Sequence, residues 1–469
     1  MLNIETVKKV FILGIKGVGM AQIAIIMHKM GKTVVGVDVP ENFITDEELK
    51  NYPITVVENF DLSSLPADTD LVIYSAAHGG TSNPLVIGAH KKNIQIMSQA
   101  EFLGSLIEKF KKSIAVCGSH GKTTTSSLLS YALTKLGVKP SYFTGSSGFN
   151  EYPAGDYNSE SYFVIEADEY GVNPPTDMTP KFLHLKPSFS LCTNIDFDHP
   201  DVFKNIQEVE AAYEKFFKQS EYNIICEDSE YATEAVKKAG VQYDSYGFSD
   251  DSTYRIINHE VNAQGSKFDL LMGEKVIADI HTALFGDHNI LNAAGVFVTL
   301  LKLGFVEAQI KDAVKDFVGA KRRFEVVYNE NAVTIVDDYA HHPEEIKAVI
   351  KAATERYGLK PVVIFQPHTF SRTQALLEDF ANSFMEASHA YILPIFASAR
   401  ENVADFTVTH LDIVKKAKER GFDAIEAVAD KQQLSAKLAS ISAPCVIMTL
   451  GAGDVYKLRS DIIRGVNTT

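Results

Sequence analysis

The chain has 469 residues, with 45 Lys and Arg against 60 Asp and Glu, so its formal net charge is −15. Hydrophobic residues make up 45% and charged residues 22%, which is ordinary for a globular protein and excludes disordered, collagen-like and disulfide-scaffold classes. The acidic balance argues against general nucleic-acid binding and against docking on an anionic membrane. The length predicts about three domains.

The cysteines lie far apart in the sequence and form no Cys-x-x-Cys pair. They are Cys117, Cys192, Cys226 and Cys445. We therefore expect reduced, mostly buried thiols in a cytoplasmic protein. The apolar run 10–15 is too short for a signal peptide, and no apolar stretch is long enough to span a membrane.

Residues 1–108 are predicted to form a Rossmann-like domain. Strands are expected at 10–14, 33–38 and 71–75, with a helix at 20–30. The turn Gly14–Gly19 joins the first strand to this helix, where a helix N-terminus can hold a diphosphate. Asp38 ends the next strand, where a carboxylate can bind a ribose or a base edge. Lys16 occupies the second glycine position of the usual fingerprint, so a tight turn with packing glycines is the alternative.

Residues 109–323 are predicted to form a P-loop ATPase-like domain around a parallel sheet. The expected strands are 113–117, 162–166, 190–195 and 223–226, with hairpin strands over 254–279, and the expected helices are 124–136, 288–303 and 307–318. The turn Gly118-Ser119-His120-Gly121-Lys122-Thr123-Thr124 lies between a strand and a helix. It resembles a phosphate-binding loop, shortened because Val116 stands where the first glycine would be. In such loops N–H groups cradle phosphates, the lysine contacts the β and γ oxygens, and the hydroxyl binds Mg²⁺.

Polar clusters follow two later strands of this domain. Glu166, Asp168 and Glu169 end one strand, and Asp196, Asp198 and His199 end the next. Ligands of open α/β sheets lie at the carboxyl ends of the strands, so both clusters are expected to face the phosphate loop. Mg²⁺ needs only a few oxygen ligands, and Glu166 with Thr123 would suffice. Capping or solvated-loop roles are the alternative.

Two further motifs lie toward the end of this region. Asn289 and Asn292 stand at the start of a predicted helix after His288, three positions apart and on one face. Their amides can pair with an adenine edge, although asparagine there is commonly a helix cap. Arg323 closes a basic triplet at the domain boundary, where it is either solvated or able to close onto a phosphate.

Residues 324–469 are predicted to form a C-terminal Rossmann-like domain. The expected strands are 333–337, 361–365, 390–393 and 446–450, and the expected helices are 343–357 and 373–387. Asp338, His341 and His342 follow the first strand, which indicates catalysis or metal binding, or a capping role for His342 before Pro343. Arg372 follows the next strand and could bind a carboxylate bidentately.

Together these motifs resemble the Mur ligase family of peptidoglycan synthesis over essentially the whole chain. The matching segments are 14–20, 118–124, 166–170, 193–199, 286–292, 319–325, 337–343, 366–373 and 451–456. The last three are most similar to the alanine-adding members, whereas 166–170 also resembles the ligase that attaches a recycled tripeptide. Lys16, Ser119 and the segment 145–161 depart from the family pattern.

The resemblance implies an ATP-dependent ligase that joins L-alanine to the lactyl carboxylate of UDP-N-acetylmuramate through an acyl phosphate. Its cofactor would be Mg²⁺, with ATP as co-substrate, and its partners would include neither nucleic acid nor membrane. We expect a monomer or a weak homodimer. The nearest rival is the tripeptide-adding ligase, and the rivals of other classes are an NAD-dependent oxidoreductase and a non-catalytic nucleotide-binding scaffold.

The resemblance also implies residue roles. The catalytic set would be Lys122, His199, Arg323, His341, His342 and Arg372. ATP would be bound by Gly118, Ser119, His120, Gly121, Lys122, Thr123, Thr124, His288, Asn289, Asn292, Arg323 and Asp338. The UDP portion would be held by Gly14, Gly17, Val18, Gly19, Asp38 and Ser75. The metal ligands would be Thr123, Glu166 and His199.

Overall fold

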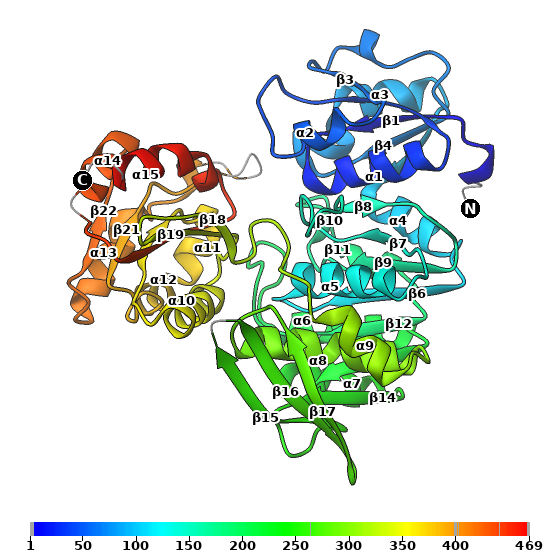
Figure 1. Cartoon of the computed structure of the whole chain (residues 1–469). Coiled ribbons are helices and arrows are strands. Elements are labelled where there is room, and N and C mark those ends of the chain that lie inside the picture. The colour runs from blue at the N-terminus through cyan, green and yellow to red at the C-terminus, as the bar shows by residue number, and fades with distance from the viewer. Residues whose placement is uncertain (1–3, 263, 398–400, 402, 440, 467–469) are drawn as a thin grey trace.

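Three α/β domains follow one another along the chain, as the length and the motifs predicted (Figure 1). The structure is a computed structural model that describes residues 4–262, 264–397, 401, 403–439 and 441–466. The N-terminal domain, in blue, lies above the central domain, in cyan to green, and the C-terminal domain, in yellow to red, lies beside them. The boundaries at 108 and 323 remain predictions.

The N-terminal domain is a five-stranded sheet with the order β3-β2-β1-β4-β5 and parallel pairing throughout. Its elements are β1 (Lys9–Leu13), α1 (Val18–Lys29), β2 (Thr33–Val37), α2 (Asp46–Leu49), β3 (Thr55–Val57), β4 (Leu71–Tyr74), α3 (Pro84–Lys91), β5 (Gln95–Ser98) and α4 (Gln99–Ile107). The predicted strands and helix are confirmed to within a few residues. β1 is central, so the turn between β1 and α1 lies at the middle of the sheet's carboxyl edge.

The central domain is built on a ten-stranded sheet with the order β17-β16-β15-β14-β13-β12-β6-β9-β7-β8. Its strands are β6 (Lys112–Cys117), β7 (Ser141–Phe143), β8 (Gly155–Asp156), β9 (Tyr162–Glu166), β12 (Phe189–Cys192), β13 (Tyr222–Cys226), β14 (Tyr243–Gly247), β15 (Tyr254–Asn262), β16 (Gly265–Met272) and β17 (Lys275–Thr282). Its helices are α5 (Lys122–Lys135), α6 (Ile206–Gln219), α7 (Glu230–Ala239), α8 (Asp287–Lys302) and α9 (Glu307–Val314).

The order of the central strands explains why distant motifs meet. β6 pairs in parallel with β12 on one side and with β9 on the other. The segments that follow these three strands therefore leave the same edge of the sheet, side by side. This confirms that the phosphate loop and the two polar clusters are neighbours.

The sheet is parallel in its core, as predicted, and the hairpin strands expected over 254–279 are found at one margin. β15, β16 and β17 pair antiparallel, as do β7 and β8. Since hairpin strands need only a short turn, they extend the sheet without crossover helices. The strand predicted at 190–195 ends at Cys192, and the helix predicted at 307–318 ends at Val314.

A small hairpin absent from the predicted elements lies between β9 and β12. Its strands β10 (Gly171–Asn173) and β11 (Asp177–Pro180) pair antiparallel and lead directly into a short 3-10 helix, η4 (Lys181–His184). Asn173 Nδ2 donates to Thr81 Oγ1 of the N-terminal domain at 3.2 Å. The hairpin thus connects the central domain to the N-terminal domain next to the β1–α1 turn.

The C-terminal domain is a six-stranded sheet with the order β18-β19-β23-β20-β21-β22, parallel except for β18. Its strands are β18 (Glu325–Glu330), β19 (Val333–Asp338), β20 (Val362–Phe365), β21 (His389–Ile392), β22 (Ile425–Ala427) and β23 (Cys445–Leu450). Its helices are α10 (Pro343–Tyr357), α11 (Phe370–Ala375), α12 (Leu377–Asn382), α13 (His410–Glu419), α14 (Lys431–Leu438) and α15 (Arg459–Val466).

One predicted helix of this domain is wrong in detail. The helix expected at 373–387 is two short helices, α11 and α12, separated at Leu376, whose φ and ψ are −112° and 24°. α11 begins earlier than predicted because Thr369 caps it by accepting a hydrogen bond from Arg372 N. The early start puts Arg372 inside the first turns of a helix.

The buried cores of the three domains are apolar and include the cysteines. All four cysteines are buried and unbridged, which confirms the prediction of free thiols. Across the described residues, no helix combines the length and apolar character that a membrane crossing requires.

Candidate active site

The turn between β6 and α5 is shaped to hold an anion at a helix N-terminus. Gly118 and Gly121 have φ values of +131° and +80°. A Cβ on Gly118 would lie 2.1 Å from Thr193 Oγ1. Both the backbone conformation and the filled space therefore require glycine there. α5 begins at Lys122, earlier than the predicted Thr124, so its unpaired N–H groups and its positive dipole end face the turn.

The segment after β12 fixes this turn. His120 N donates to Asn194 Oδ1 at 2.9 Å. Ser119 Oγ accepts from Asp196 N at 2.8 Å and donates to Asp196 O at 3.1 Å. The loop is thus held from two positions by backbone and side-chain groups of its neighbour strand.

Lys122 lies beneath the turn with its ammonium group buried. Its Nζ donates to Gly118 O at 2.5 Å and to Glu169 Oε2 at 2.8 Å. Burial disfavours the charged form, but the carboxylates of Glu169 and Glu166 outweigh it and raise the pKa of Lys122 above its ordinary value. Lys122 is therefore a permanent cation, and a phosphate oxygen would compete with Glu169 for it.

Thr123 and Glu166 form a second contact beside the loop. Thr123 Oγ1 donates to Glu166 Oε2 at 2.7 Å, and Arg323 Nη2 donates to Thr123 Oγ1 at 3.2 Å. Glu166 rests on Gly145, where a Cβ would lie 2.4 Å from Oε1. Burial raises the pKa of Glu166 to about 7, against the opposing effect of Lys122. The structure thus brings together three residues that the sequence analysis assigned to metal and phosphate binding.

A second group of ligands surrounds His199. Ligand atoms of Glu169, Asp198 and His199 all lie within 4.8 Å of one another. His199 was predicted as a ligand, whereas Glu169 and Asp198 were noted only as cluster members. Burial lowers the pKa of His199, but Asp198 and Glu169 outweigh it and raise that pKa. The signal available in the sequence was their position at the ends of neighbouring strands.

Both groups fit Mg²⁺. Carboxylate and hydroxyl oxygens are its preferred protein ligands, and Thr123 with Glu166 supplies them on one side of the loop. Glu169 and Asp198 supply them on the other side, with one imidazole from His199. Mg²⁺ bound there would neutralise the negative charge of a triphosphate.

Arg372 connects the C-terminal domain to this second group. Its Nε and Nη2 donate to the same oxygen, Asp198 Oδ1, at 3.1 and 2.9 Å. Burial disfavours the charged Asp198 carboxylate, but Arg372 and His199 outweigh it and hold the pKa of that group well below its usual range. Arg372 therefore already has a carboxylate partner, which the sequence analysis did not foresee.

A cavity of about 240 Å³ lies between the central and C-terminal domains, next to the phosphate loop. The predicted ATP-binding residues that line it are His120, Gly121, Thr124, His288, Asn289, Asn292, Arg323 and Asp338. The other predicted ATP-binding residues belong to the adjoining β6–α5 turn and the start of α5. They are Gly118, Ser119, Lys122 and Thr123. We call this space the nucleotide cavity.

Part of the wall of the nucleotide cavity is aromatic and was missed by the sequence analysis. Phe285 and Phe324 have their ring centroids 6.1 Å apart with an interplanar angle of 29°. The Arg356 guanidinium lies 3.8 Å from the centroid of Phe285. A flat apolar wall of this kind suits a purine base. Phe285 directly precedes the segment 286–292 and Phe324 lies within the segment 319–325, so their position in the sequence was the available signal.

The asparagines of α8 are not helix caps. The N-cap residue is Gly286, and no side chain caps this helix. Asn289 Nδ2 donates to Phe285 O at 2.8 Å, and Asn292 Nδ2 donates to Asn289 Oδ1 at 3.1 Å. The capping alternative is therefore wrong, and both amides belong to the wall of the nucleotide cavity.

Asp338 is the last residue of β19 in the C-terminal domain. Its carboxylate accepts hydrogen bonds from Phe324 N and Ala340 N, both at 2.7 Å. Burial raises the pKa of Asp338 to about 6, although Arg323 favours the charged form. Asp338 thus fixes the backbone at Phe324 and Ala340 and also lines the nucleotide cavity.

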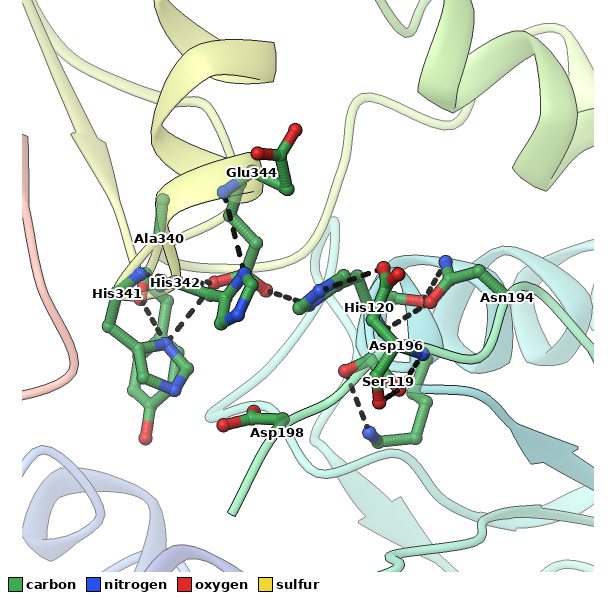
Figure 2. A network of polar contacts seen from close by, with 12 residues as sticks. Ser119, His120, Asn194, Asp196, Asp198, Ala340, His341, His342 and Glu344 are labelled. Carbon is green, nitrogen blue, oxygen red and sulfur yellow. Dashed lines mark hydrogen bonds and ion pairs between the residues drawn. The ribbon is translucent and has the colours of Figure 1, made fainter. Parts of the chain in front are cut away.

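A chain of ionisable groups joins the phosphate loop to the first turn of α10 (Figure 2). His120 Nδ1 lies 3.3 Å from Glu345 Oε1, and His120 Nε2 lies 3.4 Å from Asp196 Oδ2. Burial lowers the pKa of His120, but these two carboxylates outweigh it and raise that pKa to about 10. Glu345 also accepts from the backbone N–H of His341 and His342 at 3.0 and 3.2 Å. Glu345 is therefore an interdomain contact that the sequence analysis missed.

His342 is the N-cap of α10, as the capping alternative proposed. Its side chain accepts from Glu344 N at 3.4 Å, and Glu345 completes a capping box. Burial lowers the pKa of His342 to about 4. His342 lines neither the nucleotide cavity nor the two cavities described below. Its position supports a capping role and gives no support to the predicted catalytic one.

A cavity of about 400 Å³ lies between the N-terminal and central domains, and we call it the donor cavity. All the residues predicted to hold UDP line it, namely Gly14, Gly17, Val18, Gly19, Asp38 and Ser75. Asp38 accepts from Lys16 N at 2.7 Å, and His78 Nε2 lies 3.2 Å from Asp38 Oδ1. Lys16 points elsewhere, because its Nζ donates to Val39 O at 3.0 Å and to Glu58 Oε1 at 2.6 Å.

A third cavity of about 470 Å³ lies between the central and C-terminal domains on the side of η4, and we call it the acceptor cavity. His199, His341 and Arg372 line it together with His368 and Glu401. Burial and Arg372 lower the pKa of His341, which favours its neutral form. The structure thus brings these three predicted residues together at one cavity.

Three family models match consecutive parts of the chain. A model of the catalytic domain of the Mur ligase family matches residues 9–111, a model of the Mur ligase middle domain matches 116–300, and a model of the Mur ligase glutamate ligase domain matches 322–453. The order of the models follows the three sheets.

Solved structures share the same arrangement. A UDP-N-acetylmuramate–alanine ligase from Thermotoga maritima is 24% identical, with 98% of this chain and 100% of that chain covered and a TM-score of 0.80. A murein peptide ligase from Psychrobacter arcticus is 20% identical, with 98% and 99% covered and a TM-score of 0.73. A UDP-N-acetylmuramate:L-alanyl-gamma-D-glutamyl-meso-diaminopimelate ligase from Neisseria meningitides is 25% identical, with 68% and 100% covered and a TM-score of 0.61. The first two establish a shared three-domain fold.

Proposed function

The chain belongs to the Mur ligase family, and we propose that it is the member that joins L-alanine to the lactyl carboxylate of UDP-N-acetylmuramate. The observation that carries the proposal is the meeting of three cavities around one phosphate loop. Glu166 lines the donor cavity and binds Thr123 in α5, while His120 of the same loop lines the nucleotide cavity. The acceptor cavity adjoins the donor cavity through shared lining residues. A donor, a nucleotide and an acceptor can therefore occupy one site together.

The chemistry that such a site has to perform is activation of a carboxylate. A free carboxylate is a poor acyl donor, so one of its oxygens attacks the γ-phosphorus of ATP, the bond to the β-phosphate oxygen breaks, and an acyl phosphate and ADP form. The neutral amine of alanine then adds to the acyl carbon. The tetrahedral intermediate expels phosphate, the nitrogen's surplus proton leaves with the phosphate, and an amide remains.

The chain supplies the cations that this transfer requires. Lys122, under the phosphate loop, is placed to bind the β and γ oxygens and to stabilise charge as the phosphoryl group moves. Arg323, at the boundary between the central and C-terminal domains, contacts Thr123 at the start of α5, where it can bind the γ-phosphate. Both residues hold charge at fixed positions, so little reorganisation is needed during the reaction.

Arg372 and His341 support binding of the amino acid. The Arg372 guanidinium is planar, and Asp198 occupies its Nε and one terminal nitrogen, which leaves donors on the other terminal nitrogen for a carboxylate. His341 lines the same cavity, and its lowered pKa keeps it neutral at pH 7. A neutral imidazole there favours an acceptor with an uncharged amine.

The tripeptide-adding activity is the second candidate, and one observation favours it. The acceptor cavity is about 470 Å³, within the range that holds drug-sized ligands and larger than alanine requires. The segment 166–170 also resembles that ligase. The motif 366–373, which carries Arg372, favours alanine as the acceptor.

The rivals of other classes are not supported. An NAD-dependent oxidoreductase would use the β1–α1 turn as its whole site, whereas this chain adds a second phosphate loop and matches the family over three domains. A binding scaffold needs no convergent set of Lys122, Glu166, His199 and Arg372.

The test is release of phosphate from ATP in the presence of UDP-N-acetylmuramate and one acceptor at a time. The acceptors are L-alanine, L-serine, glycine and the tripeptide L-alanyl-γ-D-glutamyl-meso-diaminopimelate, with a reaction lacking acceptor as the control. We expect the highest kcat/KM with L-alanine. A higher kcat/KM with the tripeptide would replace the first proposal with the second, and no acceptor-dependent release would reject both.

A further inference from the structure

Three residues line both the donor cavity and the acceptor cavity. They are Asp168, Lys181 and Tyr339. Asp168 and Lys181 belong to the central domain, and Tyr339 follows β19 of the C-terminal domain. The two cavities therefore meet at these side chains. A bond between a donor in one cavity and an acceptor in the other has to form at this junction.

Lys181 is held at the junction by its neighbours. Its backbone N–H donates to Tyr170 O at 3.0 Å, and its Nζ donates to Asp168 Oδ2 at 2.7 Å. The ammonium also lies 5.6 Å from the centroid of the Tyr170 ring. Its side chain is 19% exposed. An ammonium has three N–H donors, and Asp168 uses one of them.

The position of Lys181 along the donor cavity matches the charges of the donor. One end of the cavity is the glycine turn at the start of α1, where backbone N–H groups suit a diphosphate. Lys16, the cation of that turn, points away toward Glu58. Among the described lining residues of the donor cavity, Lys181 is the one lysine or arginine, and it lies at the end next to the acceptor cavity.

Tyr339 closes the other side of the junction. Its ring centroid lies 5.1 Å from the guanidinium carbons of both Arg322 and Arg323. Arg323 in turn donates to Thr123 beside the phosphate loop. Tyr339 therefore connects the junction to Arg323 and, through Arg323, to the phosphate loop.

On the basis of the proposed function, we propose that Lys181 binds the lactyl carboxylate of the donor and holds its oxygen through both chemical steps. One carboxylate oxygen attacks the γ-phosphorus while the other accepts an N–H of Lys181. When the amine adds to the acyl carbon, that second oxygen becomes the oxyanion and keeps the same donor. The oxyanion collapses to the amide carbonyl as phosphate leaves. Lys181 donates the same hydrogen bond throughout and transfers no proton.

A purely structural role for Lys181 predicts different effects of the substitutions on activity. The Lys181–Asp168 pair could serve only to hold Asp168 in place, and Asp168 also accepts from Tyr170 N at 3.1 Å and shapes the segment after β9. In that case Asp168→Asn would reproduce the loss caused by Lys181→Met, and the double variant would be no worse than either. Under the proposal, Lys181→Met is the more severe change and Asp168→Asn leaves most of the activity.

The experiment compares Lys181→Met, Lys181→Arg, Lys181→Ala, Asp168→Asn and the double variant Lys181→Met/Asp168→Asn with the wild-type chain. Lys186→Met is the matched control, because Lys186 is exposed and lies in the same segment. Single-turnover ADP formation is measured with ATP and UDP-N-acetylmuramate, and binding of UDP-N-acetylmuramate is measured by calorimetry. Ethylamine is added to Lys181→Ala to restore an ammonium group in the space that the side chain leaves.

We expect Lys181→Met to slow ADP formation roughly 100-fold or more, as for loss of one preorganised charge donor. Donor affinity should fall less than about fivefold, since most donor contacts lie at the glycine turn, and Lys186→Met should match the wild type. Lys181→Arg should retain part of the rate, and ethylamine should raise the rate of Lys181→Ala with saturation.

Two results would overturn the inference while leaving the proposed function intact. One is Lys181→Met with a rate within threefold of wild type, and the other is Asp168→Asn with the full loss and no amine rescue of Lys181→Ala. Absence of donor-dependent ADP formation by the wild-type chain would instead reject the proposed function, and the inference with it.

Discussion

At the scale of single residues, each main cation of the site is already paired with a carboxylate of the chain. Lys122 is bound by Glu169, Arg372 by Asp198 and His120 by Glu345. Because unpaired buried charges are costly, such pairs keep the cations charged inside the protein. A chain with a net negative charge can thus contain a cationic site. When anionic substrates bind, they replace these carboxylates as partners of the cations.

The residue-scale prediction concerns Lys122. Lys122→Ala should lower the rate of ADP formation by roughly a factor of 10² to 10³, about 3–4 kcal/mol in the transition state. Binding of UDP-N-acetylmuramate should persist, because Lys122 is not part of the donor cavity wall. Lys218→Ala is the control, since Lys218 pairs with Glu214 on the surface of α6. Single-turnover kinetics with calorimetry of the donor tests both statements, and normal turnover by Lys122→Ala would remove the ATP assignment.

At the scale of elements, the tight turn after β6 depends on space as well as on backbone conformation. Gly118→Ala places a Cβ 2.1 Å from Thr193 Oγ1 at a φ of +131°. Gly240→Ala is the matched control, because Gly240 has a φ of +66° and nothing within 4 Å of its Cβ position. We expect Gly240→Ala to cost about 1 kcal/mol of unfolding free energy and Gly118→Ala at least about 2 kcal/mol more. Urea unfolding of both variants measures the difference, and equal costs would contradict the packing argument.

The cap of α10 predicts a pH dependence. The pKa of His342 is about 4 in the folded chain, below the ordinary value of 6.5. The unfolded chain therefore binds more protons between these values, so the stability contributed by neutral His342 is lost as the pH falls from 6.5 toward 4. His342→Asn keeps a capping side chain that does not titrate. Between pH 7 and pH 5 this variant should lose about 2 kcal/mol less unfolding free energy than the wild type.

Urea unfolding of both chains at pH 7 and pH 5 checks this forecast. Other groups titrate in both chains alike, so the comparison isolates His342. An identical pH dependence in the two chains would show that His342 is protonated as easily in the folded chain as in the unfolded one.

At the scale of the whole molecule, the contacts between the C-terminal and central domains include three beside the ligand cavities. They are Arg356 to Phe285, Arg372 to Asp198 and Glu345 to His120. All three lie beside the nucleotide or acceptor cavity, so the placement of the domain and the geometry of the site are coupled. Domain closure is accordingly expected to limit turnover in part.

Glu345→Ala tests this coupling. It removes the partner of His120 and half of the capping box of α10. We expect a larger radius of gyration in solution scattering and a roughly tenfold higher KM for ATP, because misplacement of a domain weakens every contact in the cavity it closes. Glu355→Ala is the control, since Glu355 is exposed on the same helix and lines none of the three cavities. Identical scattering and KM in the two variants would show that Glu345 does not hold the domain.

Part of the fold and of the candidate site could be predicted from the sequence. The strand–turn–helix context of Gly118–Thr124 and the order of the polar clusters predicted one shared edge of a parallel sheet, which the strand pairing confirms. The residues predicted to hold UDP line one cavity, and their role in binding stays a prediction. Local sequence patterns were sufficient for these predictions because each motif directly follows a strand of the sheet.

Other features depend on pairings between distant segments. The Asp198 partner of Arg372 and the Glu345 partner of His120 come from other domains, so no spacing in the sequence reveals them. Lys181 follows a hairpin that has no strong alternation of apolar residues, and its place between two cavities appears only in three dimensions. The split of the helix expected at 373–387 likewise follows from the cap at Thr369.

The proposed reaction requires that ATP activates the lactyl carboxylate as an acyl phosphate before alanine attacks. The most direct measurement uses UDP-N-acetylmuramate labelled with ¹⁸O in both lactyl carboxylate oxygens, with ATP and L-alanine, and mass spectrometry of the released phosphate and the product. The account predicts one ¹⁸O in each phosphate and one in the new amide. Phosphate without ¹⁸O, together with unchanged donor, would contradict it.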